Sequence, residues 1–538
     1  MEKNGFNDTA EQNINRGDEK GFSPSETETE NGDRTYLSSS ETAAENGSET
    51  RLSSETEAEA KTAGYFRHSK TDTAVKVLRC ALTVFSLAVY IIYLIANKEK
   101  LTVPTYIITF VCIALFTALG LYAMPVIIRD FTGRGKAYYP ENADTKKHFF
   151  CICIIALIFY IASTLIGTLM YKYFYTDAPE DFFTLMQNAW MKENTDAQHY
   201  FTIAENWYVN EGDDKVLIVF FPLFPCLIRL LNFITGNSYI SSHIINITAS
   251  AAGAGVLYLT FHKLFGGFIK TEKNTGAAVW EDRAFFAVII ALLMPGMIFM
   301  CSPMTEPLFF LFTVCCFYFI SERKFLIAAV SAAFAGFTRS VGILLVIPIV
   351  FEAISDIIRT NRNRKPISMK CAVLIAAAVI SCMGTFAYLM INKSVTGDAF
   401  KFAEYQLSNW DQSIGFFVDT PRYLWDYFIK YLERGDIMTA LSLQLAQLIM
   451  IFASLIIYLF AAKRLPASYT LYFMAYFVIA VGCTWLLSGI RYLSLLLPLP
   501  AAVAALCNKK GARITAVSVL ALMNFVYLFM YMARMQVY

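Results

Sequence analysis

The stretch Val216–Thr235, VLIVFFPLFPCLIRLLNFIT, decides how this chain is threaded through a membrane. It is as long and as apolar as a transmembrane helix, which needs about 20 residues. Pro222 and Pro225 interrupt it, however, and a proline inside a helix removes a hydrogen bond and clashes with the preceding turn. We therefore predict a re-entrant or interfacial segment, packed against other parts of the protein, rather than a span.

The positions of the basic residues support this interpretation. Counting Val216–Thr235 as a span would place the basic loop Lys263–Arg283 outside and would invert every later loop. Without it, and with the N-terminus in the cytoplasm, every basic cluster falls on the cytoplasmic side, as the positive-inside rule requires. The two long loops, 172–215 and 392–440, and the C-terminus then lie outside.

The composition places the chain among multi-pass membrane proteins. It is 56% hydrophobic and 16% charged, whereas a soluble protein carries about 25% charged residues. We predict an all-α, polytopic membrane helical bundle with about thirteen transmembrane helices, each near the length that a bilayer requires. Their approximate limits are 76–96, 104–128, 149–171, 239–262, 284–302, 305–321, 324–338, 341–359, 371–391, 441–462, 467–487, 490–508 and 512–533.

The chain divides into three regions. Residues 1–64 are acidic and rich in Ser, Thr and Glu. Such a segment cannot bury enough apolar area to offset its ordering entropy, so we predict a disordered cytoplasmic tail. Residues 65–148 hold two N-terminal spans and a cytoplasmic loop, and residues 149–538 hold the main membrane domain with both long outer loops.

Several common chemistries have no motif in this sequence. The 12 cysteines lie nearly all in apolar runs and lack the spacing of zinc ligands, so no metal site is predicted. There is no Walker motif, H-E-x-x-H or G-x-S-x-G, and no room for a soluble nucleotide-sugar-binding domain. No feature indicates nucleic-acid binding.

Asp196 and His199 are the first candidates for chemistry. They lie in the first long loop, in TDAQHYFTIAENWY from Thr195, and on a helix they would share one face with Tyr200 and Ile203. Two ionisable groups above an apolar and aromatic body suit an interfacial helix whose polar end faces a pocket. The alternative is an ordinary loop helix with solvated polar residues.

Glu306, Arg339 and Arg491 are the other candidates, each at the outer end of an apolar run and the last beside Tyr492. An ionisable residue at membrane depth costs about 2.5–3.5 kcal/mol on insertion scales, so it is a functional candidate by default. Alternatives are a structural ion pair between Glu306 and Arg339, and a snorkelling anchor at Arg491.

These charges share one rim of the predicted bundle with Asp196. Two cations would offset the charge that develops on a leaving phosphate, and a carboxylate would accept the proton of an attacking hydroxyl. Such a rim suits transfer of a group from a phosphate-linked lipid. A flippase or transporter should instead show polar groups at the midplane and repeated halves, and a membrane scaffold needs no such cluster.

The motifs of this chain resemble those of the PIG-V mannosyltransferases, a family of the GT-C class of membrane glycosyltransferases. The first element is Asp196-Ala-Gln-His199-Tyr200 with Ile203-Ala204-Glu205 and Tyr208, and the second is FFPLFPCLIR from Phe220. SPMTE from Ser302, TRSVG from Thr338 and Arg491-Tyr492 follow in the family's order. Two positions depart from the pattern, because Thr195 replaces the usual Trp and Trp207 the usual Gly.

The resemblance implies a GT-C-like fold and an inverting transfer, most simply of mannose, from a polyprenyl-phosphate donor to a lipid-linked or glycan hydroxyl. It implies Asp196 as general base and substrate binding by His199, Glu306, Arg339, Arg491 and Tyr492, with no cofactor and no metal. In eukaryotes the family acts on a GPI precursor in the endoplasmic reticulum. We favour a bacterial relative in the cell membrane.

Overall fold

A computed structural model describes residues 73–133, 145–191, 195–266, 282–362, 366–484 and 486–537. The chain divides into two compact units, Met1–Thr71 and Asp72–Tyr538, and all described residues belong to the second. The predicted tail at residues 1–64 lies outside them. Regular structure in these ranges is helical, with no named strand and one isolated bridge between Ile414 and Cys483. The prediction of an all-α polytopic protein is confirmed.

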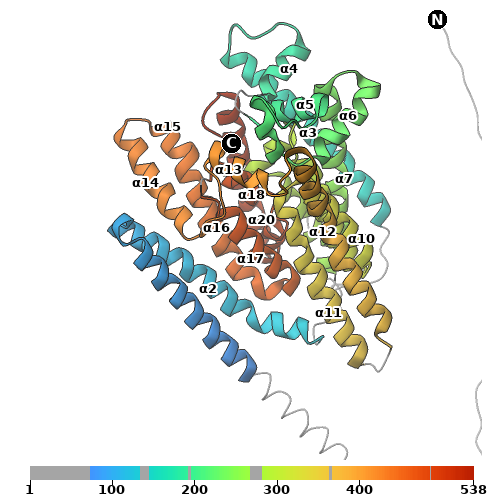
Figure 1. Cartoon of the computed structure of the whole chain (residues 1–538), viewed down its shortest axis with the longest axis vertical. Coiled ribbons are helices and arrows are strands. Elements are labelled where there is room, and N and C mark those ends of the chain that lie inside the picture. The colour runs from blue at the N-terminus through green and yellow to red at the C-terminus, as the bar shows by residue number, and fades with distance from the viewer. Residues whose placement is uncertain are drawn as a thin grey trace, which may run out of the picture. The chain divides into compact units, whose positions relative to one another are not determined.

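Eight helices of the described chain are long and apolar enough to cross a bilayer, which makes this a multi-pass membrane protein. They are Thr73–Ala96, α2 (Val103–Phe131), α3 (Thr145–Phe174), α7 (Ser238–Gly266), the unit Ser340–Arg362 that contains α11 (Val346–Arg362), α12 (Ser368–Thr396), the unit Ile437–Arg464 that contains α16 (Ala446–Ala461), and α20 (Lys510–Met532). Each corresponds to one predicted span (Figure 1).

The predicted total of thirteen spans is not confirmed. Four predicted spans are shorter apolar helices, namely α8 (Arg283–Leu292), α9 (Glu306–Ser321), α10 (Phe325–Thr338) and α17 (Ala467–Val481). The span predicted at 490–508 is two short helices, α18 (Gly489–Ser494) and α19 (Pro498–Leu506). Proline explains two of the breaks: Pro295 begins a 3-10 turn after α8, and Pro498 begins α19.

The segment 216–235, for which the sequence predicts an interruption, is sharply bent. The 3-10 helix η2 (Asp213–Val219) and α6 (Leu223–Thr235) meet at 111°, with Pro222 at the bend. Two tyrosines satisfy the backbone there, because Tyr388 Oη donates to Ile218 O at 2.8 Å and Tyr208 Oη donates to Phe220 O at 2.7 Å. The predicted interruption is confirmed, and its carbonyls are paired within the protein, as irregular backbone at membrane depth requires.

The two long loops are themselves largely helical. The first contains α4 (Phe182–Trp190) and α5 (Ala197–Asn206), and α5 packs beside α6 (Figure 1). The second contains α13 (Lys401–Trp410) and α14 (Asp419–Glu433). Helix α13 packs on η2 and α14 packs on α2, so the second loop contacts both the first loop and the N-terminal helices.

Candidate active site

Asp196 stands at the N-cap of α5, where an aspartate would ordinarily accept a hydrogen bond from the first turn. Its side chain makes no such bond. Instead Oδ2 lies 3.1 Å from Arg491 Nη1. Helix α5 is fixed beneath it by Tyr200, Ile203 and Ala204, which are buried. The carboxylate is thus held on a packed helix and faces a cation from a segment far along the chain.

Glu306 is the buried centre of the charged cluster. It opens α9, and its side chain is fully buried. Its Oε1 atom accepts hydrogen bonds from both Arg339 Nη1 and Arg491 Nε. Within the described residues its Oε2 atom has no hydrogen-bond partner. One carboxylate therefore aligns two guanidinium groups and retains an unused acceptor atom.

Arg339 projects from the extended residue between α10 and the next 3-10 helix, at φ −153° and ψ 148°. Gly342 makes this tight turn possible, because a Cβ there would lie 2.3 Å from the backbone of Ala335. Arg339 Nη1 also donates to Thr305 Oγ1 at 3.1 Å. The guanidinium carbon stands 5.1 Å from the centre of the Tyr492 ring, within cation–π range.

Arg491 lies on the six-residue helix α18, which neighbouring segments hold closely. Gly489 N donates to Gln447 Oε1 at 2.8 Å, and Gly296 N donates to Ser494 Oγ at 3.0 Å. A Cβ on Gly296 would lie 2.8 Å from the Cα of Arg491, so only glycine permits this approach. The Arg491 guanidinium carbon also lies 5.1 Å from the centre of the Phe299 ring.

The structure therefore brings Asp196, Glu306, Arg339, Arg491 and Tyr492 into one cluster. His199 stands beside it rather than in it: its ring packs against Phe220, with 5.0 Å between the ring centres. Phe299 and Thr305 also contact the arginines of the cluster. Tyr476 Oη donates to Tyr492 O at 3.1 Å, and Gln447 binds Gly489 in the helix that carries Arg491. Thr305 belongs to the SPMTE motif and Gln447 is polar within an apolar run, so both carried a signal in the sequence, whereas Phe299 carried none.

Several guanidinium N–H groups of the cluster have no protein partner among the described residues. The two carboxylates and two guanidinium groups are formally neutral together. In the described part of the chain, no partner is recorded for Arg339 Nε and Nη2 or for Arg491 Nη2. Arginine presents its N–H groups in a planar fork that matches the oxygens of a phosphate. The arrangement can bind an anion while a carboxylate stands next to it.

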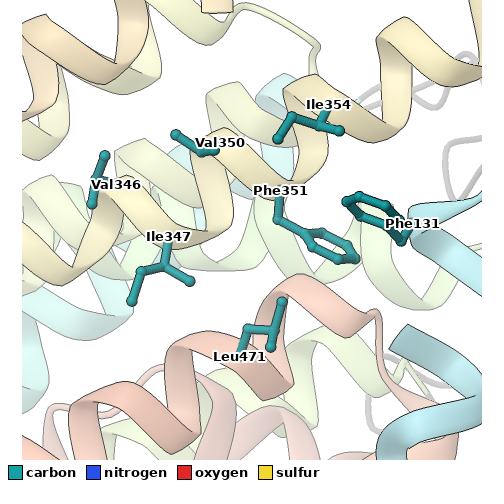
Figure 2. A pocket seen from close by; sticks show the side chains of 7 residues that line it. All are labelled: Phe131, Val346, Ile347, Val350, Phe351, Ile354 and Leu471. Atoms are coloured by element: carbon teal, nitrogen blue, oxygen red, sulfur yellow. The ribbon is translucent and has the colours of Figure 1, made fainter. Parts of the chain in front are cut away.

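A pocket elsewhere in the bundle has no chemistry of this kind. It is an open hollow of about 350 Å³ between α11, α17 and the end of α2, and only apolar side chains line it: Phe131, Val346, Ile347, Val350, Phe351, Ile354 and Leu471. Figure 2 shows Phe131 and Leu471 facing the α11 residues. No ionisable side chain reaches it, so it is not a candidate for group transfer.

No group of three or more His, Cys, Asp or Glu residues that could hold a metal ion occurs in the residues that the structure describes. Asp196 and Glu306 meet through Arg491 and not through a shared ion position. The charge opposite each carboxylate is a guanidinium group.

Comparison with known proteins finds a family model that matches part of this chain. Residues 176–408 match the family model described as Mannosyltransferase (PIG-V). The matched segment contains Asp196, His199, Glu306 and Arg339, whereas Arg491 and Tyr492 lie beyond its end. No curated protein and no solved structure matches the chain.

Proposed function

We propose that this PIG-V family mannosyltransferase, a membrane glycosyltransferase, takes mannose from a polyprenyl-phosphate donor with Asp196 as the general base. The observation that carries the proposal is the double role of Arg491, which binds both Asp196 and Glu306. The same guanidinium group can therefore bind either the phosphate of a donor or the carboxylate that accepts the proton.

Arg339 and Arg491 would bind the phosphate of the donor through the N–H groups that have no recorded protein partner. Both side chains are largely buried, with 12% and 6% of their surfaces exposed. Charge-assisted hydrogen bonds are strongest where water is excluded, and fixed donors of this kind stabilise charge that develops on a leaving group. Tyr492 would hold Arg339 in place through its ring.

Asp196 is the carboxylate of the pair that a hydroxyl can reach, since 34% of its side chain is exposed and none of Glu306 is. The pairing with Arg491 engages one oxygen of this carboxylate. A donor phosphate would compete for Arg491 and release the carboxylate. Binding of the donor would thereby switch on the base.

The reaction is a single displacement at the anomeric carbon. The acceptor hydroxyl gives its proton to Asp196 as its oxygen forms a bond to that carbon. The bond from the carbon to the phosphate oxygen breaks at the same time, and the phosphate keeps the electron pair. Attack opposite to the leaving group inverts the configuration. Glu306 takes no part in proton transfer and serves to position both arginines.

The acceptor is a lipid-linked or glycan hydroxyl, as expected for the family. His199 would contact this acceptor, because it lies one helical turn from Asp196 on α5. We place the cluster on the outer or lumenal face, with the N-terminus in the cytoplasm and the C-terminus outside, from the basic residues of the opposite loops. The membrane would be the cell membrane in a bacterium and the endoplasmic reticulum in a eukaryote. The competing idea of a transporter without catalysis has no observation in its favour.

The test is Asp196→Asn in purified protein, with radiolabelled mannosyl-phosphoryl-polyprenol as donor. General-base removal lowers turnover by about 10²–10⁴-fold, and the nearly isosteric amide preserves the fold. Asp214→Asn is the matched control, because Asp214 is an exposed carboxylate of the same loop. Unchanged turnover in the Asp196 variant would overturn the assignment.

A further inference from the structure

Three rings from three separate segments meet beside Asp196. His199 belongs to α5, Phe220 to the bend between η2 and α6, and Trp410 is the last residue of α13. The ring centres of His199 and Phe220 are 5.0 Å apart, and those of Phe220 and Trp410 are 5.9 Å apart. Phe220 is buried, whereas His199 and Trp410 are half-buried and each packs against it. Two of the three rings are therefore partly accessible to a molecule that binds near Asp196.

The second long loop is fastened so that Trp410 stays in this position. Asp411 ends α13 in the left-handed region, at φ 52°. Thr484 N donates to Ser413 O at 3.0 Å, and Ser413 N donates to Thr484 Oγ1 at 2.8 Å. Thr484 precedes α18, the helix that carries Arg491, by only a few residues. The loop thus connects the ring set directly to the arginine segment.

The polar atoms of the two half-buried rings bind no other part of the described protein. Within the described residues, no hydrogen bond is recorded for the indole N–H of Trp410 or for either ring nitrogen of His199. A tryptophan N–H that is withdrawn from bulk water ordinarily finds a partner. The two rings therefore offer an apolar face and N–H groups that a bound molecule can use.

We propose that His199 and Trp410 form a subsite that binds the pyranose ring of a glycosylated acceptor. A pyranose presents a face of C–H groups that packs on an aromatic ring, and hydroxyls at its rim that bond to N–H groups. Asp196 and His199 lie one helical turn apart, with about 5–6 Å between such Cβ positions. A sugar whose hydroxyl meets Asp196 therefore extends over the His199 side. This inference rests on the proposed function.

The acceptor sugar, rather than the donor sugar, fits this position. The donor is held through its phosphate by Arg339 and Arg491, and the hydroxyl that Asp196 deprotonates belongs to the acceptor. Trp410 lies outside the segment that matches the family model. The rings would therefore select acceptors that carry a sugar ring over acceptors with hydroxyls alone.

The test compares two simple alcohols against the same labelled donor: n-octyl α-mannopyranoside, which has a ring, and 1-O-octylglycerol, which has hydroxyls without one. The wild type should take the mannoside at a lower KM. Trp410→Ala should raise the KM for the mannoside by about tenfold, as loss of an aromatic contact predicts. The KM for octylglycerol and for the donor should stay within about twofold, and Trp410→Phe should retain most of the preference.

Trp425→Ala is the matched control, because Trp425 is a half-buried tryptophan of the same loop on α14, and it should keep the wild-type preference. The proposal is overturned if the wild type does not distinguish the two alcohols, if it uses neither, or if Trp410→Ala raises both KM values equally. A rise confined to the KM for the donor would assign the rings to the donor sugar instead. Failure of the Asp196→Asn test leaves these KM ratios unaltered, so the two proposals fail separately.

Discussion

Two arginine–carboxylate networks of this protein differ in how fully the nitrogens of their arginines are used. One lies on α14, and the other, the α5–α18 cluster, consists of Asp196, Glu306, Arg339 and Arg491. In the α14 network, Arg422 Nε and Nη2 bind both oxygens of Asp419, and Nη1 binds Asp426 at 3.0 Å. Tyr93 Oη adds a bond of 2.7 Å to Asp419. In the α5–α18 cluster, both arginines keep N–H groups without a recorded partner, and Glu306 keeps a buried oxygen.

The difference separates structure from function. A network in which each nitrogen of the guanidinium group has a carboxylate partner joins two elements, here the N-terminal helices and the second long loop. A buried network with unmatched polar atoms is costly unless something completes it. Every guanidinium nitrogen of Arg422 is paired within the α14 network, whereas the α5–α18 cluster keeps donors for the substrate that we propose. Three substitutions test this contrast.

Glu306→Gln should have the largest effect. The amide keeps the shape but removes the charge that two buried arginines share, and breaking a buried pair in this way costs about 3–5 kcal/mol. We expect a large fall in the thermal midpoint of the detergent-purified protein and no measurable transfer. Asp419→Asn, in the half-exposed α14 network, should lower the midpoint much less. Equal losses in the two variants would remove the contrast.

Arg339→Lys should have the next largest effect. Lysine keeps the positive charge but lacks the planar fork, so its contact to Glu306 can persist while the donors for phosphate are lost. We expect kcat to fall by about 10²–10³-fold, the range for loss of one charge-stabilising donor, with little change in stability. Arg422→Lys makes the same exchange in the α14 network. It should leave kcat intact and cost under about 1 kcal/mol of stability.

Gly296→Ala should have the smallest effect of the three. The added methyl group would lie 2.8 Å from the Cα of Arg491, so α18 must shift. Overpacking of this kind costs about 1–3 kcal/mol, and we expect a raised KM for the donor with a modest loss of stability. Gly511→Ala is the control, since a methyl group there meets nothing within 4 Å. Wild-type kinetics in the Gly296 variant would show that α18 tolerates displacement.

The sequence indicated the four charged residues that meet, but not how they meet, and it also indicated His199, which packs on Phe220 instead. Charges are costly at membrane depth, so Glu306, Arg339 and Arg491 were visible as exceptions in apolar runs. A single sequence holds no information on which oxygen serves which guanidinium group, and the bridge from Asp196 to Arg491 spans 295 residues. Trp410 was missed because an aromatic residue in a polar loop is ordinary.

The fold shows the same limit. Pro222 and Pro225 predicted the bend correctly because proline chemistry is local. The number of spans was not obtained in the same way, because α8 and α9 lie largely among other helices and do not need bilayer length. Most residues of these two helices are buried. Hydropathy measures how apolar a run is and does not say whether lipid or protein covers it.

The attachment of α2 has a consequence for how the protein is made. Helix α2 packs on α11, α14, α16 and α17, and the carboxylate of Asp130 near its end accepts a bond from Ala467 N, 337 residues later in the chain. At about 5–20 residues per second, ribosomes need roughly 20–70 s to produce that partner. Until then the first two helices lie in the membrane without the later helices that pack on α2. A membrane chaperone that shields them during this interval would raise the yield of assembled enzyme.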